Sequence, residues 1–239
     1  FVTPEQKQNL DLSSWDIAFT GAEPIRHQTL DRFANAFESC GFRREAFYPC
    51  YGMAETTLIV SGGQKAKPPI TFQVDIAALK KNQVVRAIAN SENAYTFVGC
   101  GKSSPELSIV IVNPESLTQC PPDRIGEIWV SGASVAQGYW NEPLLTKQIF
   151  QAQLQNNGDG PYFRTGDNGF LHNGELFITG RLKDLIIIRG SNHYPQDIEQ
   201  TVEQCHRALR PGCGAAFSIE VADKEELVIV YELERRHLR

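Results

Sequence analysis

The chain has 239 residues, of which 41% are hydrophobic and 21% charged, and its formal net charge is −5. This is the composition of a globular protein with a sizeable core, and the acidic balance argues against nucleic acid as a partner. We expect no membrane span, since no apolar run reaches the roughly 18 residues required. The six cysteines lack C-x-x-C spacing and no signal peptide is evident, so we expect reduced thiols and a cytoplasmic protein.

Hydrophobic periodicity and turn residues predict the elements in chain order. Residues 16–20, D-I-A-F-T, are expected to form a short buried strand. Residues 27–40 are expected to form a helix, because apolar positions recur every three or four residues until a glycine ends the pattern. Residues 62–105 are interrupted by glycines, prolines and polar runs, which is typical of an extended insertion with some strands and a short helix near residues 76–81.

A second group of strands follows the insertion. Residues 108–112 and 127–131 are predicted strands joined through a P-P-D turn, and H-N-G at residues 172–174 is a hairpin signal. After about residue 183 the expected elements follow the order strand, helix, strand, strand. We therefore place a domain boundary near Lys183, which divides the chain into residues 1–182 and 183–239. The elements expected after it are a strand at 185–188, a helix that opens at Pro195 with Ile198, Val202 and Cys205 on one face, and strands at 215–219 and 227–233. The fold class is mixed α/β.

The first cluster with chemical potential is F-T-G-A-E-P at residues 19–24. A strand ends there in a turn that contains glycine, and the proline fixes the direction in which the chain leaves. Exposed backbone groups at such a turn can line a flat ring such as a purine. When this cluster is considered alone, an ordinary strand-to-helix turn is the better explanation.

The second cluster is Y-G-M-A-E-T at residues 51–56. Tyr51 can stack on a base, and Gly52 lets the backbone approach it. Glu55 offers the hard oxygen ligands that Mg²⁺ prefers, and Thr56 can donate to a phosphate oxygen. The alternative for Glu55 is a solvated acid near a helix N-terminus.

The third cluster lies within residues 165–199, where five glycines punctuate a segment that carries Asp167, Arg181 and Lys183. Asp167 follows T-G at a strand end, where a carboxylate can accept from both ribose hydroxyls. The guanidinium fork of Arg181 suits a diol or a phosphate. A structural Asp–Arg pair is the alternative. Lys183, at the proposed boundary, has the position of a hinge.

Taken in order, these motifs resemble those of the adenylate-forming superfamily, which includes acyl-CoA ligases, peptide-synthetase adenylation domains and luciferases. Residues 51–56 are similar to Y-G-x-x-E-T, and residues 162–167 to Y-x-R-T-G-D. Residues 126–146 are similar to G-E-I-x-V…G-Y-W-x-x-P-x-x-T, and residues 180–199 to G-R-x-K-D…E. The resemblance implies the C-terminal part of the large domain of that fold, followed by the start of its small α+β domain.

The resemblance also implies roles for individual residues. Mg²⁺ would be bound by Glu55, and the α-phosphate of ATP or the adenylate would be contacted by Thr56. Asp167 and Arg181 would hold the ribose, and Lys183 would be the hinge between two half-reactions. The residues implied to surround adenine are Gly21, Ala22, Glu23, Pro24, Tyr51, Gly52 and Met53.

Residues 189–199, R-G-S-N-H-Y-P-Q-D-I-E, are similar to the corresponding motif of fatty acyl-AMP ligases rather than to that of CoA ligases. Those enzymes carry an insertion after the Y-G-x-A-E motif that is associated with loss of CoA-dependent thioester formation, and we place it within about residues 62–100. The implied reaction is fatty acid plus Mg·ATP giving acyl-AMP and pyrophosphate. Its acyl group would pass to an acyl carrier protein or a polyketide synthase.

Two features of the superfamily do not occur in these 239 residues: the Gly/Ser/Thr-rich phosphate loop, and the lysine near the C-terminus that assists adenylation. The chain begins at Phe1 without Met and stops at Arg239 just after a predicted strand. We therefore expect a segment of a longer protein that lacks activity by itself. The alternatives are a fatty acyl-CoA ligase and a non-catalytic fragment that binds nucleotide or acyl-adenylate.

Overall fold

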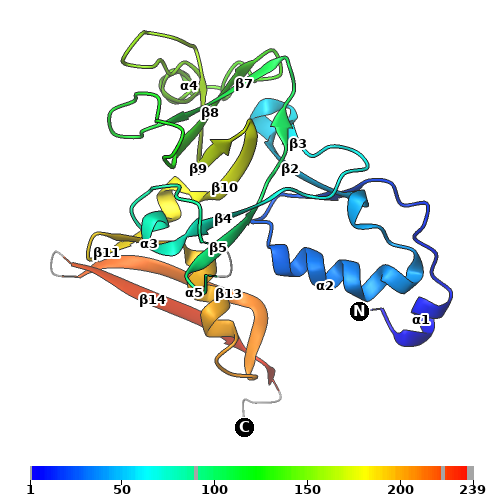
Figure 1. Cartoon of the computed structure of the whole chain (residues 1–239). Helices are drawn as coiled ribbons and strands as arrows, with labels where there is room; N and C mark the ends of the chain where they lie inside the picture. The colour runs from blue at the N-terminus through cyan, green and yellow to red at the C-terminus, as the bar shows by residue number, and fades with distance from the viewer. Residues whose placement is uncertain (1, 89–90, 222–223, 236–239) are drawn as a thin grey trace.

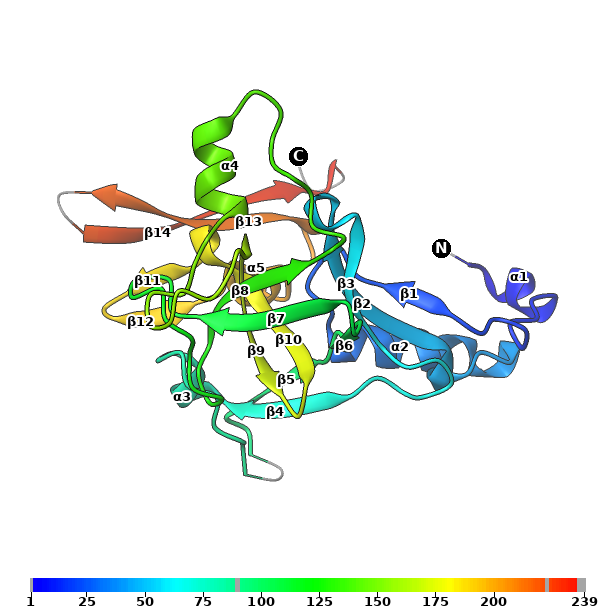
Figure 2. The same cartoon turned by 90° about the horizontal axis from the view of Figure 1, so that it is seen from above.

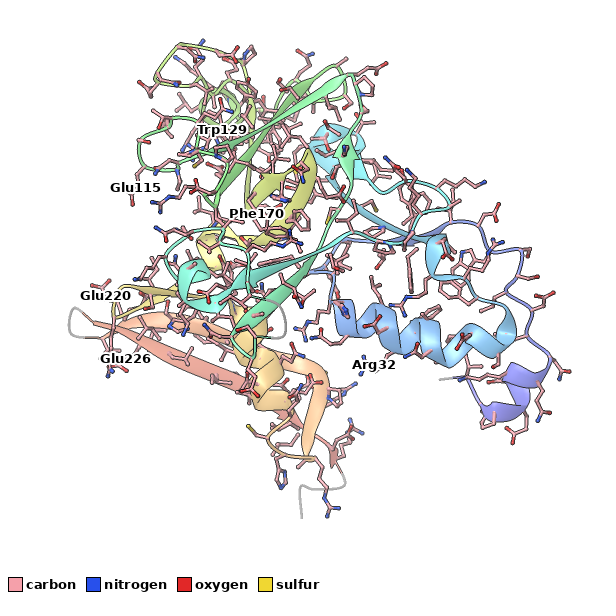
Figure 3. All side chains as sticks on the ribbon, in the orientation of Figure 1. Arg32, Glu115, Trp129, Phe170, Glu220 and Glu226 are labelled. Atoms are coloured by element: carbon pink, nitrogen blue, oxygen red, sulfur yellow. The ribbon has the colours of Figure 1, made fainter. Side chains whose placement is uncertain are left out.

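The computed structural model describes residues 2–88, 91–221 and 224–235, so residues 89 and 90 of the predicted insertion lie outside the description. Figure 1 shows α2 on one side of the molecule, a sheet of β7 to β10 at the top, and the β13–β14 hairpin below. Within the described residues, no helix has both the length and the apolarity to cross a membrane. Trp129 and Phe170 lie inside the molecule, whereas Arg32, Glu115 and Glu220 are on its surface (Figure 3).

The N-terminal part is a four-stranded sheet in the order β1-β2-β3-β6, with α2 beside it. β1 pairs parallel with β2, and the apolar stripe of α2 packs against them through Leu30, Ala34 and Phe47. The predicted strand and helix are therefore confirmed, although a 3-10 turn replaces the last helical residues. The strand is not buried as expected, because Phe19 is 64% exposed. The bounds are α1 Pro4–Gln8, β1 Ala18–Thr20, α2 His27–Phe37, β2 Phe47–Met53, β3 Leu58–Gly62 and β6 Lys102–Ser103.

The central sheet is antiparallel throughout, in the order β10-β9-β8-β7, and is seen from above in Figure 2. Asn173 and Gly174 both have positive φ, 54° and 79°, which is the geometry of a tight two-residue hairpin turn. The predicted strands and the hairpin are confirmed, whereas α4 was not predicted. The bounds are β7 Leu107–Val112, β8 Gly126–Gly132, α4 Pro143–Phe150, β9 Phe163–His172 and β10 Glu175–Arg181.

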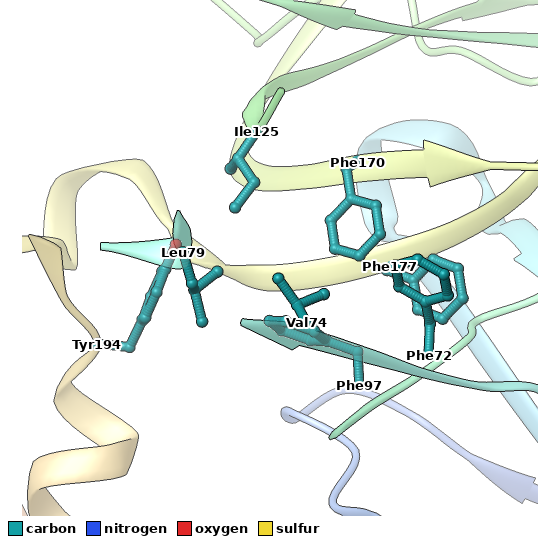
Figure 4. Packing of buried hydrophobic residues seen from close by; sticks show 8 residues of the cluster. All are labelled: Phe72, Val74, Leu79, Phe97, Ile125, Phe170, Phe177 and Tyr194. Carbon is teal, nitrogen blue, oxygen red and sulfur yellow. The ribbon is translucent and has the colours of Figure 1, made fainter. Parts of the chain in front are cut away.

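The predicted insertion, within residues 62–100, contains a two-stranded sheet, β4 Thr71–Asp75 and β5 Ala94–Val98, with α3 Ile76–Leu79 directly after β4. The short predicted helix is therefore confirmed. The apolar face of this sheet packs on the central sheet, and Tyr194 from the C-terminal part completes the same core (Figure 4). The buried members of this core are Phe72, Val74, Leu79, Phe97, Ile125, Phe170, Phe177 and Tyr194.

The C-terminal part begins after a 3-10 turn at Leu182–Asp184. It contains the small β11–β12 hairpin, then α5 packed on the long β13–β14 hairpin. β11, α5, β13 and β14 were predicted and β12 was not, and the placement of Cys205 on the helix was wrong. The helix ends at Glu203, and Cys205 lies exposed beyond it. The bounds are β11 Ile186–Ile188, β12 Ser191–His193, α5 Pro195–Glu203, β13 Leu209–Val221 and β14 Lys224–Leu233.

Gly52 lies at a bulge where the pairing of β2 with β3 shifts register. A Cβ at this position would lie 1.6 Å from the carbonyl oxygen of Leu58, so the strands must separate to accommodate it. We expect Gly52→Ala to lower the free energy of unfolding by about 1–3 kcal/mol, as measured by urea denaturation. Gly63→Ala is the matched control, because its Cβ would be 3.4 Å or more from any neighbour. Equal stability of the two variants would contradict the prediction.

Candidate active site

A cavity of about 1050 Å³ lies where β2, β9, β10 and the start of the C-terminal part meet. Segments far apart in the chain line it: residues 22–25, 50–53, 163–167 and 178–184. Most residues that the sequence predicted as site residues are therefore brought together. Those lining the cavity are Ala22, Glu23, Pro24, Tyr51, Gly52, Met53, Glu55, Asp167, Arg181 and Lys183.

Two predicted residues, Gly21 and Thr56, are not among those that line the cavity. The side chain of Thr56 is only 1% exposed, and its hydroxyl donates to the carbonyl oxygen of Met53 at 3.0 Å. A Cβ on Gly21 would lie 2.7 Å from the carbonyl oxygen of Cys50. The glycine therefore lets its backbone pack closely against Cys50, which lines the cavity. Their contacts with a nucleotide remain predictions.

Tyr51, Asp167 and Arg181 form a chain of polar contacts on the wall of the cavity. The hydroxyl of Tyr51 donates to Oδ2 of Asp167 at 2.7 Å, and Nε of Arg181 lies 3.9 Å from Oδ1. Burial raises the pKa of Asp167 above its usual value, while Tyr51 and Arg181 act in the opposite direction. Burial, followed by the charge of Asp167, raises the pKa of Tyr51 well above its usual value, so Tyr51 remains a donor.

Asp167 lies inside β9, beside an irregularity in the pairing with β8, so its predicted place at a strand end was wrong. The backbone before it is held by the neighbouring strand. Thr165 donates from its hydroxyl to the carbonyl oxygen of Ile128 at 2.7 Å, and its Oγ1 accepts from the backbone N–H of Asp167 at 3.1 Å. Gly166 has φ of 72°, a left-handed conformation that favours glycine. The T-G-D sequence therefore fixes the direction of the carboxylate through local backbone geometry.

A buried ion pair, Glu127 with Arg164, also lines the cavity and was not predicted as part of the site. Nη2 of Arg164 lies 2.7 Å from Oε2 of Glu127, and Nε lies 3.1 Å from the same oxygen. Oε1 of Glu127 accepts from the backbone N–H of Gly166 at 3.2 Å. The guanidinium also lies over the ring of Trp129, 5.4 Å from its centroid. This pair supports the segment of β9 that carries Asp167.

Glu55 is half-buried at the edge of the cavity, and its Oε1 accepts from the hydroxyl of Tyr139 at 2.9 Å. Burial, and then this bond, raise the pKa of Tyr139 to about 12. Within residues 2–88, 91–221 and 224–235, no three His, Cys, Asp or Glu side chains gather into a metal cluster. A single carboxylate fits Mg²⁺, which keeps several waters and uses substrate phosphates as its other ligands.

Two thiols, Cys50 and Cys100, also line the cavity, and all six cysteines are free as predicted. Burial raises the pKa of both thiols, that of Cys100 to about 12. Because the thiolate is the nucleophilic form, both groups are protonated and unreactive at neutral pH. Neither thiol of the cavity is therefore a good nucleophile at neutral pH.

Lys183 lies exposed in the 3-10 turn between β10 and β11. The residues that follow it bond back to the rest of the chain. Nε2 of Gln196 donates to the carbonyl oxygen of Thr179 at 2.9 Å, and Nη2 of Arg26 donates to the carbonyl oxygen of Gln196 at 3.1 Å. The C-terminal part therefore forms one wall of the cavity through Gln196 and its neighbours.

Known proteins with similar sequences bind or form adenylates, as the lining of this cavity suggests. The pattern of the family described as "AMP-binding enzyme" matches residues 2–140. A medium-chain-fatty-acid–[acyl-carrier-protein] ligase of Moorena producens, JamA, is 51% identical over 98% of this chain. A long-chain-fatty-acid–AMP ligase of Mycolicibacterium smegmatis, FadD32, is 40% identical over 88% of it. The chain spans 40% and 35% of the lengths of these relatives.

The solved structure of the Legionella pneumophila fatty acyl-adenylate ligase, in complex with acyl adenylate and pyrophosphate, is similar over the whole chain. Its TM-score is 0.74 at 42% identity, and the chain covers 41% of that protein. The expected fold, the large adenylate-forming domain followed by the start of a small one, agrees with this likeness. The chain belongs to the AMP-binding enzyme family, among relatives that are fatty acid–acyl carrier protein ligases and fatty acyl-AMP ligases.

Proposed function

We propose that the protein carrying this chain activates a fatty acid with ATP, forming acyl-AMP and pyrophosphate, and transfers the acyl group to an acyl carrier protein. The observation that carries the proposal is the cavity itself: residues of all three motifs line it, although the second and third motifs are more than 100 residues apart in the sequence. The relatives named above are enzymes of this class.

Asp167 and Arg181 are the proposed ribose-binding residues. The carboxylate of Asp167 faces the cavity, where a ribose diol can donate two charge-assisted hydrogen bonds to it. Among the described residues, the hydroxyl of Tyr51 donates to Oδ2 of Asp167. Oδ1 has only the contact with Nε of Arg181, at 3.9 Å. Ala22, with φ of 65°, turns the backbone of residues 22–24 along the cavity, where it can line the adenine ring.

Glu55 is the proposed ligand of Mg²⁺. When bound, the ion neutralises charge on the phosphates of ATP while the fatty acid carboxylate attacks the α-phosphorus. The protein's own contribution is mostly positioning, because fixed groups need no reorganisation during the reaction. Glu55 is suited to this role because its second oxygen, Oε2, accepts no hydrogen bond from the described residues.

We propose that the boundary between the large and small domains lies at Lys183 and that this residue is the hinge. The supporting observation is its position in an exposed 3-10 turn, between a strand of the central sheet and the small β11–β12 hairpin. Arg181 and Lys183 both line the cavity, so a rotation about this turn changes the groups presented to the adenylate.

A carrier protein, rather than free CoA, is the proposed acceptor. The support is that the insertion holds the start of the C-terminal part. Nδ2 of Asn192 donates to Oδ1 of Asn82 at 2.9 Å, its backbone N–H donates to the carbonyl oxygen of Lys80 at 3.1 Å, and Tyr194 is buried in the core of the insertion. These contacts restrain rotation about Lys183, and the relative JamA is named as a ligase that uses an acyl carrier protein.

Incubation of the whole protein with a fatty acid, ATP and Mg²⁺ tests both the proposed adenylation and the proposed acceptor. We expect acyl-AMP to accumulate, to persist when CoA is added, and to be converted into acyl-thioester by a carrier protein that bears phosphopantetheine. Mass spectrometry distinguishes the three products. Absence of acyl-AMP would refute the adenylation, whereas formation of acyl-CoA would refute the acceptor alone.

A further inference from the structure

The loop between β8 and α4 crosses to the turn that carries Glu55. Three hydrogen bonds join them. The backbone N–H of Ala136 donates to the carbonyl oxygen of Glu55 at 2.8 Å, the hydroxyl of Thr57 donates to the carbonyl oxygen of Ser134 at 2.7 Å, and the hydroxyl of Tyr139 donates to Oε1 of Glu55 at 2.9 Å. Only the last of the three touches the carboxylate.

Tyr139 is itself fixed by the helix that follows it. Its backbone N–H donates to Oγ1 of Thr146 at 2.9 Å, and its ring meets the buried ring of Phe150 edge-on, with 5.0 Å between centroids. Gly138 permits this approach, because a Cβ there would lie 2.2 Å from Cγ2 of Thr146. The contacts with Thr146 and Phe150 therefore hold the Tyr139 hydroxyl in position beside Glu55.

We propose that Tyr139 is the positioning residue of Glu55: its hydroxyl occupies Oε1, fixes the rotamer of the carboxylate and leaves Oε2 available to hold Mg²⁺. This inference rests on the proposed metal role of Glu55. Groups that orient a metal ligand in this way typically contribute 10- to 100-fold to metal affinity. The bonds made by Ala136 and Thr57 already tie the loop to the turn, so the Tyr139 hydroxyl is not needed for that purpose.

Tyr139→Phe in the whole protein removes only the hydroxyl and keeps the packing on Phe150. We expect the affinity for Mn²⁺, measured by electron paramagnetic resonance in the presence of ATP, to fall about tenfold. The melting temperature and the affinity for AMP without metal should stay unchanged. Tyr162→Phe is the matched control, since that tyrosine also donates to a carboxylate, Asp159, at 2.8 Å but does not line this cavity. Its Mn²⁺ affinity should equal that of the unaltered protein.

Glu55→Gln separates failure of this inference from failure of the proposed metal role. Unchanged Mn²⁺ affinity in Glu55→Gln would refute the metal role, on which the inference depends. If Glu55→Gln weakens Mn²⁺ binding while Tyr139→Phe binds normally, positioning by Tyr139 is refuted alone. A Tyr139→Phe protein that melts early and loses AMP affinity to the same degree would show that the tyrosine only supports the fold.

Discussion

An Arg164→Ala variant is expected to lose about 3–5 kcal/mol of unfolding free energy, because it leaves a buried charge without a partner. Glu127 is only 2% exposed, and Arg164 provides two of its hydrogen-bond donors. The remaining donor, the backbone N–H of Gly166, cannot compensate for a full negative charge in the protein interior. The variant also loses the contact of the guanidinium with Trp129.

Denaturant unfolding of this chain measures the effect. Arg210→Ala is the control: it breaks an ion pair of the same length, 2.7 Å, but Arg210 and Glu232 are 56% and 63% exposed. Solvent screens that pair, so its removal should leave the transition unchanged. The double variant Glu127→Gln/Arg164→Met should recover most of the loss, since no charge remains buried. Equal destabilisation by Arg164→Ala and Arg210→Ala would contradict this account.

The helices, strands and turns that the sequence predicted are those specified by residues close together in the chain. Asn173-Gly174 specifies its hairpin turn by itself, and the three- and four-residue spacing in α2 specifies which face is buried. The end of α5 was placed too late, because an apolar residue at helical spacing, Cys205, continues the pattern after the helix has stopped. Local patterns therefore indicate that an element exists more reliably than where it ends.

The candidate site likewise contains residues that local motifs predict and contacts that only the folded structure brings together. Tyr51, Glu55 and Asp167 were predicted because each lies in a motif whose chemistry is evident from neighbouring residues. The partnership of Glu127 with Arg164 requires the register of β8 on β9, and the contact of Tyr139 with Glu55 requires a loop to cross between two elements. Neither long-range pairing is encoded in a short window of sequence.

Asp167→Ala is expected to weaken the binding of AMP by about 10- to 150-fold, which corresponds to the roughly 1.5–3 kcal/mol of one charge-assisted hydrogen bond. The carboxylate is partly buried at the cavity wall, so water replaces a lost ribose contact poorly. Isothermal titration of the whole protein with AMP measures the change, and circular dichroism verifies that the variant is folded.

Two further variants isolate the cause of that loss. Asp167→Asn keeps an oxygen that can accept from Tyr51 but removes the charge, so its affinity should lie between those of Asp167→Ala and the unaltered protein. Asp184→Ala removes another carboxylate that lines the same cavity. Asp184 is exposed, and no hydrogen bond joins it to Tyr51 or Asp167 in the described residues, so this variant should bind AMP at least as tightly as the unaltered protein. Since the phosphate of AMP is anionic, removing any nearby acid would by itself strengthen binding. A folded Asp167→Ala protein that binds AMP as tightly as Asp184→Ala would therefore refute the ribose role.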